Sequence, residues 1–282
     1  MSFSSDIKQE LNKNSNLANK EIVKYETMGY LVSKNTNLIE KNNARYSTES
    51  DYNINRFSKL LSNLNINHKI EINGKNFIIT FKIKEIDFIN IDKNEIYLKE
   101  EYIKEILKNE NYLKAIIRGA FMGGGSVNNP KREYHLEVDF SNEYNLEKII
   151  FILKHVNVIT KKIAKDNQYF FYIKEGEQIS NFLALIGASN AVLNFEDIRI
   201  HKEINGKVNR LVNCETANLN KTINASIEQI AAIRKLQKEG NFNKLDDNLK
   251  EIAQLRLDNP NISLRRFRQT FKKSTWKIRG KL

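Results

Sequence analysis

The stretch that decides the fold runs from Asn111 to Val127 and reads NYLKAIIRGAFMGGGSV. Its first half has the pattern of an amphipathic helix, because four apolar residues recur at the i, i+3, i+4 and i+7 spacing of one helix face. These four residues are Leu113, Ile116, Ile117 and Ala120. The pattern predicts a helix with one buried face in the middle of the chain.

The second half of this stretch is unusually rich in glycine. Each glycine costs about 1 kcal/mol in a helix interior relative to alanine, so such a density indicates close backbone contact or a turn. We expect Gly119 and Gly123 to form a helix–helix contact face, and Gly124 and Gly125 to end the helix and lead into a strand. A phosphate-binding loop is the alternative. It is disfavoured because the glycines follow a helix and no Gly-Lys-Ser/Thr ending occurs.

Residues 117–126, IRGAFMGGGS, resemble a degenerate LAGLIDADG helix of the homing endonucleases. The wider chain is similar to the WhiA family, bacterial regulators of sporulation and cell division. The segments that carry this resemblance are SFSSDIKQEL at 2–11 and NCETANLNKTINAS at 213–226. The resemblance implies an N-terminal endonuclease-like domain that has lost catalysis, followed by a C-terminal helix-turn-helix that binds DNA.

The order of the predicted elements suits this fold. Helix, strands, helix, strands, helix occurs twice along 1–188, as a pseudo-symmetric α+β fold requires. A helix over about 20–32 is the mate of the central helix and keeps Gly29 as its small contact residue. Turns at Asn73-Gly74 and Asp166-Asn167 predict one hairpin in each half.

The expected fold class is therefore α+β. A pseudo-two-fold LAGLIDADG-like domain occupies 1–188, a helical linker 189–226, and a small all-α helix-turn-helix-like domain 227–282. The topology comes from the resemblance, because periodicity alone does not fix it.

The sequence predicts no catalytic residue, no metal and no cofactor. In LAGLIDADG nucleases an acidic residue at the helix end holds a divalent metal. The resemblance places that position at Gly124 and, in the first copy, near Tyr30. Glycine offers no oxygen ligand, and Glu110 and Asp139 are interpreted as exposed carboxylates. The four histidines and Cys214 show no zinc-ligand spacing. An active metal-dependent endonuclease is the less favoured alternative.

Positive charge gathers at the end of the chain. The formal net charge is +12, from 46 basic and 34 acidic residues. From Ser263 onward the sequence has eight basic residues and no acidic one, which leaves 38 against 34 in the rest. This distribution predicts a polyanionic partner, double-stranded DNA. The candidate DNA-binding residues are Ser263, Arg265, Arg266, Arg268, Lys272, Lys273, Lys277, Arg279 and Lys281.

The same end departs from the family pattern. A helix over about 245–257 is broken at Asn259-Pro260, and Ser263 caps a new helix, as a helix-turn-helix begins. The family continues with a recognition helix of the form P-x-S-K-S-x-V-N-x-R-L, whereas this chain reads RFRQTFKKSTWK at 266–277. We therefore expect a shortened or frame-altered end in which the recognition helix is missing. Phosphate attraction persists, because it needs charge rather than shape.

The polar segment 213–224 has two interpretations. It is a solvated connector, or it is a surface for DNA phosphates or for the other domain. The second interpretation depends on four basic residues just upstream of it, namely Arg199, Lys202, Lys207 and Arg210.

The sequence shows no signal peptide and no apolar run of membrane-spanning length, so we expect a cytoplasmic, nucleoid-associated protein without a membrane partner. The expected function is a non-catalytic DNA-binding transcription regulator of cell division, chromosome segregation or sporulation. The alternative is a scaffold in which the endonuclease-like domain binds a protein partner.

Overall fold

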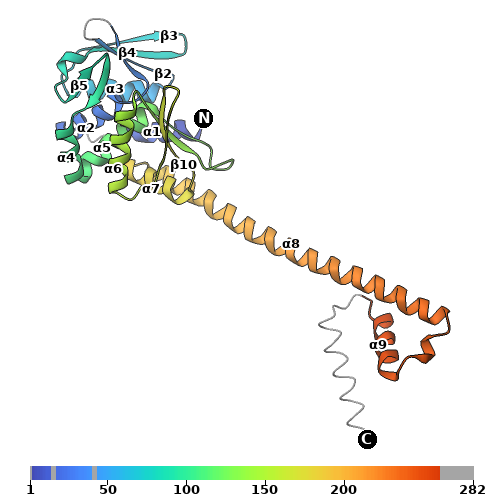
Figure 1. Ribbon diagram of the computed structural model, residues 1–282. Helices are drawn as coiled ribbons and strands as arrows, with labels where there is room; N and C mark the ends of the chain where they lie inside the picture. The colour runs from blue at the N-terminus through green and yellow to red at the C-terminus, as the bar shows by residue number, and fades with distance from the viewer. Residues whose placement is uncertain (1, 14–16, 40–42, 261–282) are drawn as a thin grey trace. The chain divides into compact units, whose positions relative to one another are not determined.

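The computed structural model describes residues 2–13, 17–39 and 43–260 of the chain (Figure 1). The chain divides into two compact units, Met1–His201 and Lys202–Leu282. The candidate DNA-binding residues between Ser263 and Lys281 lie outside the described residues. None of the described helices combines the length and the apolar content that crossing a bilayer requires.

The N-terminal unit contains helices whose ends are set by local capping. The side chains of Asn19, Ser50 and Asn142 accept hydrogen bonds from backbone N–H groups in the first turns of α2, α3 and α6. Gly187 adopts a left-handed φ of 87° and ends α7. The bounds are α1 Phe3–Lys13, α2 Lys20–Leu31, α3 Asp51–Asn63, α4 Glu100–Lys108, α5 Glu110–Gly124, α6 Glu143–His155 and α7 Gly176–Ile186.

Two four-stranded antiparallel sheets repeat the same order in the two halves. The first is β1-β2-β4-β3 and the second is β7-β8-β10-β9. The predicted turns are confirmed: Gly74 has a φ of 61°, and Asp166 and Asn167 have values of 53° and 58°. The strands are β1 Thr36–Ile39, β2 Asn43–Thr48, β3 His68–Asn73, β4 Asn76–Lys82, β7 Gly125–Val127, β8 Leu136–Phe140, β9 Lys161–Lys165 and β10 Gln168–Ile173.

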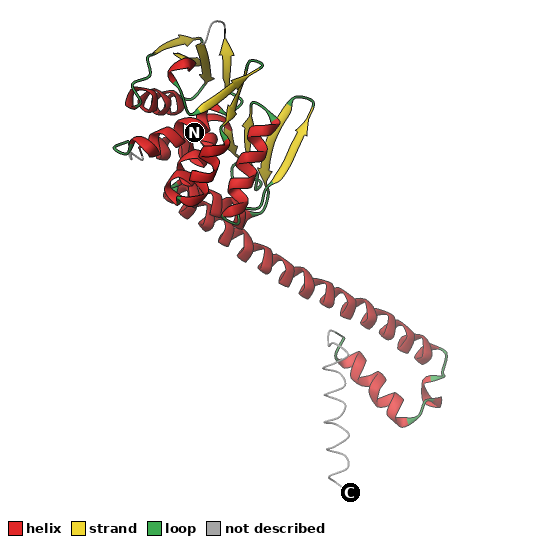
Figure 2. Cartoon of the chain, turned by 60° about the vertical axis from the view of Figure 1, so that its left-hand side comes forward, coloured by secondary structure: helices red, strands yellow, loops and turns green. Residues whose placement is uncertain are grey.

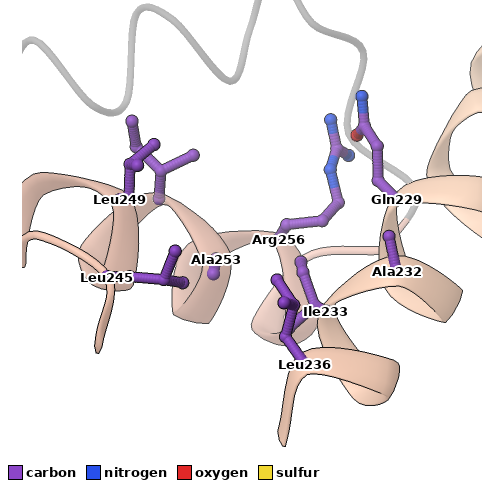
Figure 3. A pocket seen from close by; sticks show the side chains of 9 residues that line it. Gln229, Ala232, Ile233, Leu236, Leu245, Leu249, Ala253 and Arg256 are labelled. Carbon is purple, nitrogen blue, oxygen red and sulfur yellow. The ribbon is translucent and has the colours of Figure 1, made fainter. Parts of the chain in front are cut away.

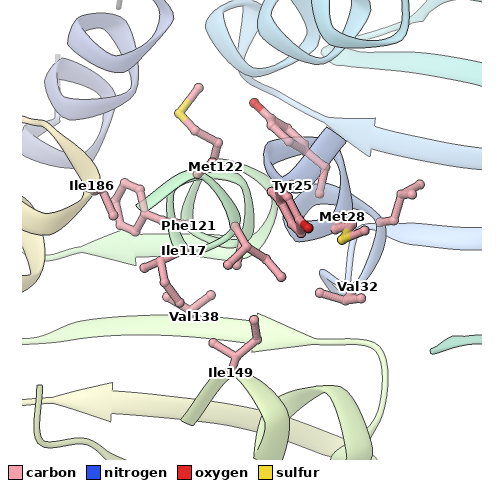
Figure 4. Close-up of a cluster of buried hydrophobic side chains, with 14 of the residues drawn as sticks. Tyr25, Met28, Val32, Ile117, Phe121, Met122, Val138, Ile149 and Ile186 are labelled. Atoms are coloured by element: carbon pink, nitrogen blue, oxygen red, sulfur yellow. The ribbon is translucent and has the colours of Figure 1, made fainter. Parts of the chain in front are cut away.

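The core of this unit lies where α2 and α5 meet the buried faces of both sheets. Figure 2 shows the sheets side by side with the helices packed against them. Figure 4 shows Phe121 and Met122 of α5 among side chains from α2, from β8 and from helices α6 and α7. The glycine-rich stretch therefore forms the centre of the fold, and the expected α+β architecture with a repeated helix-and-sheet order is confirmed.

One hairpin was not predicted. Strands β5, Ile89–Asp92, and β6, Glu95–Leu98, form a separate two-stranded sheet. The turn residues Lys93 and Asn94 both have positive φ, at 46° and 65°. A hairpin turn of this kind is usually recognised in a sequence by a glycine, because lysine rarely adopts a positive φ. This turn contains no glycine, so the sequence does not predict it.

The C-terminal unit is helical in its described part. Helix α8 runs from Ser189 to Lys238 and so includes the whole of the predicted linker 189–226. A 3₁₀ turn, η2, follows at Phe242–Lys244, and then α9 at Asp247–Asp258. Asp246 caps α9 by accepting a 2.8 Å hydrogen bond from the N–H of Leu249.

Candidate nucleic-acid interface

Helices α2 and α5 cross at two glycines. A Cβ atom on Gly119 would lie 2.0 Å from the backbone oxygen of Glu26, and one on Gly29 would lie 2.3 Å from the backbone oxygen of Ile116. Both distances are far below any real Cβ contact, so neither position accepts a larger residue without backbone movement. The two contacts are related by a shift of 90 residues, from 26 to 116 and from 29 to 119. The helices therefore follow a pseudo-two-fold relation.

This relation corrects the expected position of the metal-binding residue in the first copy. Gly124 corresponds to Lys34, not to Tyr30. Tyr30 is fully buried and stacks on Phe57, with ring centroids 4.7 Å apart. The sequence alone placed this position near Tyr30, because Gly29 is the single small residue by which the first helix can be aligned with the glycine-rich second helix.

The end of the crossing carries an ion pair rather than a cluster of carboxylates. The ammonium of Lys34 lies 3.5 Å from a carboxylate oxygen of Asp139, and a Cβ on Gly124 would lie 2.6 Å from the backbone oxygen of Asp139. Burial raises the pKa of Asp139, and Lys34 opposes that shift. Within the described ranges no three His, Cys, Asp or Glu side chains come together in a way that could hold a metal ion. These residues therefore do not fit the metal site of a LAGLIDADG nuclease.

A buried ionic network, which the sequence did not reveal, supports the crossing from one side. The Glu26 carboxylate accepts hydrogen bonds from Arg56 at 2.7 and 2.9 Å and from the Nε of Arg118 at 3.0 Å. Glu26 and Arg56 are each 1% exposed. Burial alone would raise the pKa of Glu26, but Arg118 and Arg56 outweigh it and hold this pKa below its ordinary value. The network joins α2, α3 and α5.

The open face of the first sheet is polar and carries more basic than acidic residues, with Glu71 beside Lys69 on β3. Thr80 on β4 pairs with Arg45 on β2 and with Lys69 on β3, so the three side chains lie in one row on the same face. Arg45 and Lys69 are exposed, whereas the neighbours of Arg45 on β2, Ala44 and Tyr46, are buried. This face offers cations and hydrogen-bond donors of the kind that contact a phosphate backbone.

The open face of the second sheet has a different chemistry. Glu137 on β8 pairs across to Tyr172 on β10, and Asp139 pairs with Phe170. A carboxylate oxygen of Glu137 accepts a hydrogen bond from the Nε2 of His135 at 3.0 Å, and the His135 ring stacks on Tyr172 with ring centroids 5.8 Å apart. Exposed Lys161 and Lys165 on β9 lie on this same face, so its charge is mixed.

In the C-terminal unit, the end of α8 and helix α9 line an open apolar pocket of about 340 Å³ (Figure 3). Ala253 and Arg256 of α9 are buried at 7% and 4% exposure, whereas Leu249 is 48% exposed. The pocket is lined by Gln229, Ala232, Ile233, Leu236, Leu245, Leu249, Ile252, Ala253 and Arg256. The predicted helix over 245–257 is thus present as α9, and Ala253 and Arg256 lie on its buried face.

Comparison with known proteins identifies both parts of the chain. The WhiA LAGLIDADG-like domain family matches residues 113–205, and the WhiA C-terminal HTH domain family matches residues 208–277. A probable cell division protein WhiA of Clostridium novyi (strain NT) is 34% identical over 288 residues, covering 95% of this chain and 90% of that protein. A protein of the same name from Thermoanaerobacter sp. (strain X514) is 36% identical over 185 residues.

The match to Thermoanaerobacter covers 66% of this chain and 58% of the relative, so the alignment with that protein spans little more than half of its length. The crystal structure of full-length DUF199/WhiA from Thermotoga maritima is 27% identical, with a TM-score of 0.64, and the match covers 96% of this chain and 92% of that one. A separate structure of the N-terminal LAGLIDADG domain of DUF199/WhiA matches with a TM-score of 0.53. The chain therefore belongs to the WhiA family.

Proposed function

We propose that this protein is a non-catalytic, double-stranded-DNA-binding regulator that acts in cell division or sporulation, at the nucleoid in the cytoplasm. The observation that carries the proposal is the match of residues 208–277 to the WhiA helix-turn-helix domain. The eight basic residues from Arg265 to Lys281 lie largely within that region and have no acidic neighbours. They supply the phosphate contacts on which DNA affinity largely depends. Transcription regulation and chromosome segregation are the processes this activity would serve.

The first sheet provides a second DNA surface in this proposal. Arg45, Lys69 and Thr80 form one row on its open face. The second sheet, with Glu137 and Asp139 on its open face, is the part suited to a protein partner. A scaffold role for the domain therefore remains the second candidate function, and it depends on these carboxylates and on their aromatic neighbours.

Salt dependence tests the DNA-binding proposal. The affinity of the full chain for a labelled duplex of mixed sequence is expected to fall steeply between about 50 and 200 mM salt, because each phosphate contact contributes a slope of about −0.9. The triple variant Arg265→Ala/Arg266→Ala/Arg268→Ala is expected to reduce the magnitude of that slope by up to about 3. Fluorescence anisotropy across a salt titration measures both slopes.

The matched control removes three exposed lysines from the N-terminal unit, with Lys93→Ala, Lys104→Ala and Lys131→Ala. Its slope is expected to stay at the wild-type value. An affinity that is flat with salt in the wild-type chain, or equal slopes in both triple variants, contradicts the proposal.

Cleavage separates the regulator from a nuclease. Lys34 occupies one of the two metal positions and Gly124 the other, so incubation with supercoiled plasmid and Mg²⁺ or Mn²⁺ is expected to leave the plasmid intact. Nicked or linear product above that of a chelated control would establish the enzyme instead.

A further inference from the structure

A row of asparagines follows one side of α8. Six asparagines occur between residues 205 and 224, and five of them recur at spacings of four, four, seven and four residues. At 3.6 residues per turn these five lie within about 100° of arc. All five are exposed. We name them the asparagine row; its members are Asn205, Asn209, Asn213, Asn220 and Asn224.

Helix formation does not account for the row. Asparagine is a poor helix former, because its side chain competes for backbone hydrogen bonds. A chain rich in asparagine for reasons of composition would distribute the residue around the helix. Here the sixth asparagine, Asn218, points elsewhere and donates to the sulfur of Cys214 at 3.7 Å. The recurrence of asparagine along one face of α8 therefore indicates a surface that binds another molecule.

The charges around the row favour a polyanion. Arg210 follows Asn209 and Lys221 follows Asn220, so both cations lie along one edge of the row. The carboxylate of Glu203 is already paired with Lys207 at 2.7 Å. Glu215 lies away from the row, on the side of α8 that carries Leu211 and Leu219. The row itself therefore presents amides next to positive charge.

We propose that the asparagine row is a further contact surface for duplex DNA, separate both from the basic residues after Ser263 and from the first sheet. This inference depends on the DNA-binding function proposed above. Asparagine amides hydrogen-bond adenine edges and phosphate oxygens, and Arg210 and Lys221 contact phosphates along the edge. From Asn205 to Asn224 the row measures about 28 Å at 1.5 Å per residue, just under one turn of duplex. Four of its five members fall inside the matched helix-turn-helix region 208–277.

The test compares asparagines on and off the row, in the full chain, on a duplex enriched by wild-type protein from a random library. Asn209→Ala/Asn213→Ala is expected to weaken binding about tenfold at every salt concentration, with an unchanged salt slope, because the lost groups are neutral. Asn218→Ala, the matched control, is expected to change affinity less than about twofold. Alanine is the stronger helix former, so loss of helix cannot cause a weaker complex. Arg210→Ala/Lys221→Ala is expected to reduce the slope magnitude by about 2.

Equal affinities of the row variant and Asn218→Ala overturn the inference. If the Arg265/Arg266/Arg268 variant still lowers the salt slope in that experiment, the proposed function stands without the row. A row variant that changes the oligomeric mass in light scattering, with DNA affinity unchanged, also overturns it by showing that the row faces a protein. Absence of any duplex binding by the wild-type chain removes the function and the inference together.

Discussion

Gly119→Ala is expected to destabilise the N-terminal unit by about 3 kcal/mol, the upper range for overpacking a buried site. The added Cβ would lie 2.0 Å from the backbone oxygen of Glu26, and backbone cannot rotate away as a flexible side chain can. The two central helices must separate to relieve the contact, and this separation disturbs the core on both sides. Urea unfolding followed by near-ultraviolet circular dichroism of the buried tyrosines measures the loss.

Gly206→Ala is the matched control for this substitution. Gly206 is also a helical glycine, but a Cβ there meets only the guanidinium of Arg210, at an ordinary 3.6 Å. Alanine is favoured over glycine in a helix by about 1 kcal/mol, so this variant is expected to be no less stable than wild type. If Gly119→Ala and Gly206→Ala unfold at the same urea concentration, close helix contact at Gly119 is not what requires the glycine.

Glu26→Gln is expected to destabilise the same unit by about 3–5 kcal/mol. The substitution keeps the shape of the side chain and removes its charge, which leaves the cations Arg56 and Arg118 without their shared buried counter-ion. The same unfolding measurement applies. Lys114→Gln breaks an exposed pair with Glu110 on α5 and is expected to cost less than about 1 kcal/mol. A loss in Glu26→Gln no larger than in Lys114→Gln would show that the network adds nothing to stability.

The pH dependence has a definite sign. The pKa of Glu26 is lower in the folded protein than in the unfolded chain, so its stabilising contribution is fully present above the unfolded carboxyl pKa of about 4.3. It is lost as the pH falls through the folded value. The stability advantage of wild type over Glu26→Gln is therefore expected to narrow from about pH 4 downwards. An advantage that stays constant with pH would assign the loss to packing rather than to charge.

Local sequence patterns predicted most helices and strands. The features that the sequence did not predict depend on an unusual turn or on contacts between residues far apart in the chain. The glycines of 119–125 predicted a helix contact, a helix end and a strand. Glycine destabilises a helix, so several of them together indicate close backbone contact or a change of backbone direction. The β5–β6 hairpin was missed because Lys93 and Asn94 turn the chain without glycine. The network around Glu26 was missed because its partners on α3 and α5 lie far from it in sequence. No sequence rule pairs three charged residues on three separate helices.

Geometry as well as residue identity disfavours a carboxylate at position 124 of this chain. A codon change that gives Gly124 a carboxylate also drives its Cβ to within 2.6 Å of the β8 backbone, at the carbonyl of Asp139. Strand β8 would have to shift before this position could hold any side chain larger than that of glycine, and the β7–β8 pairing of the second sheet would shift with it.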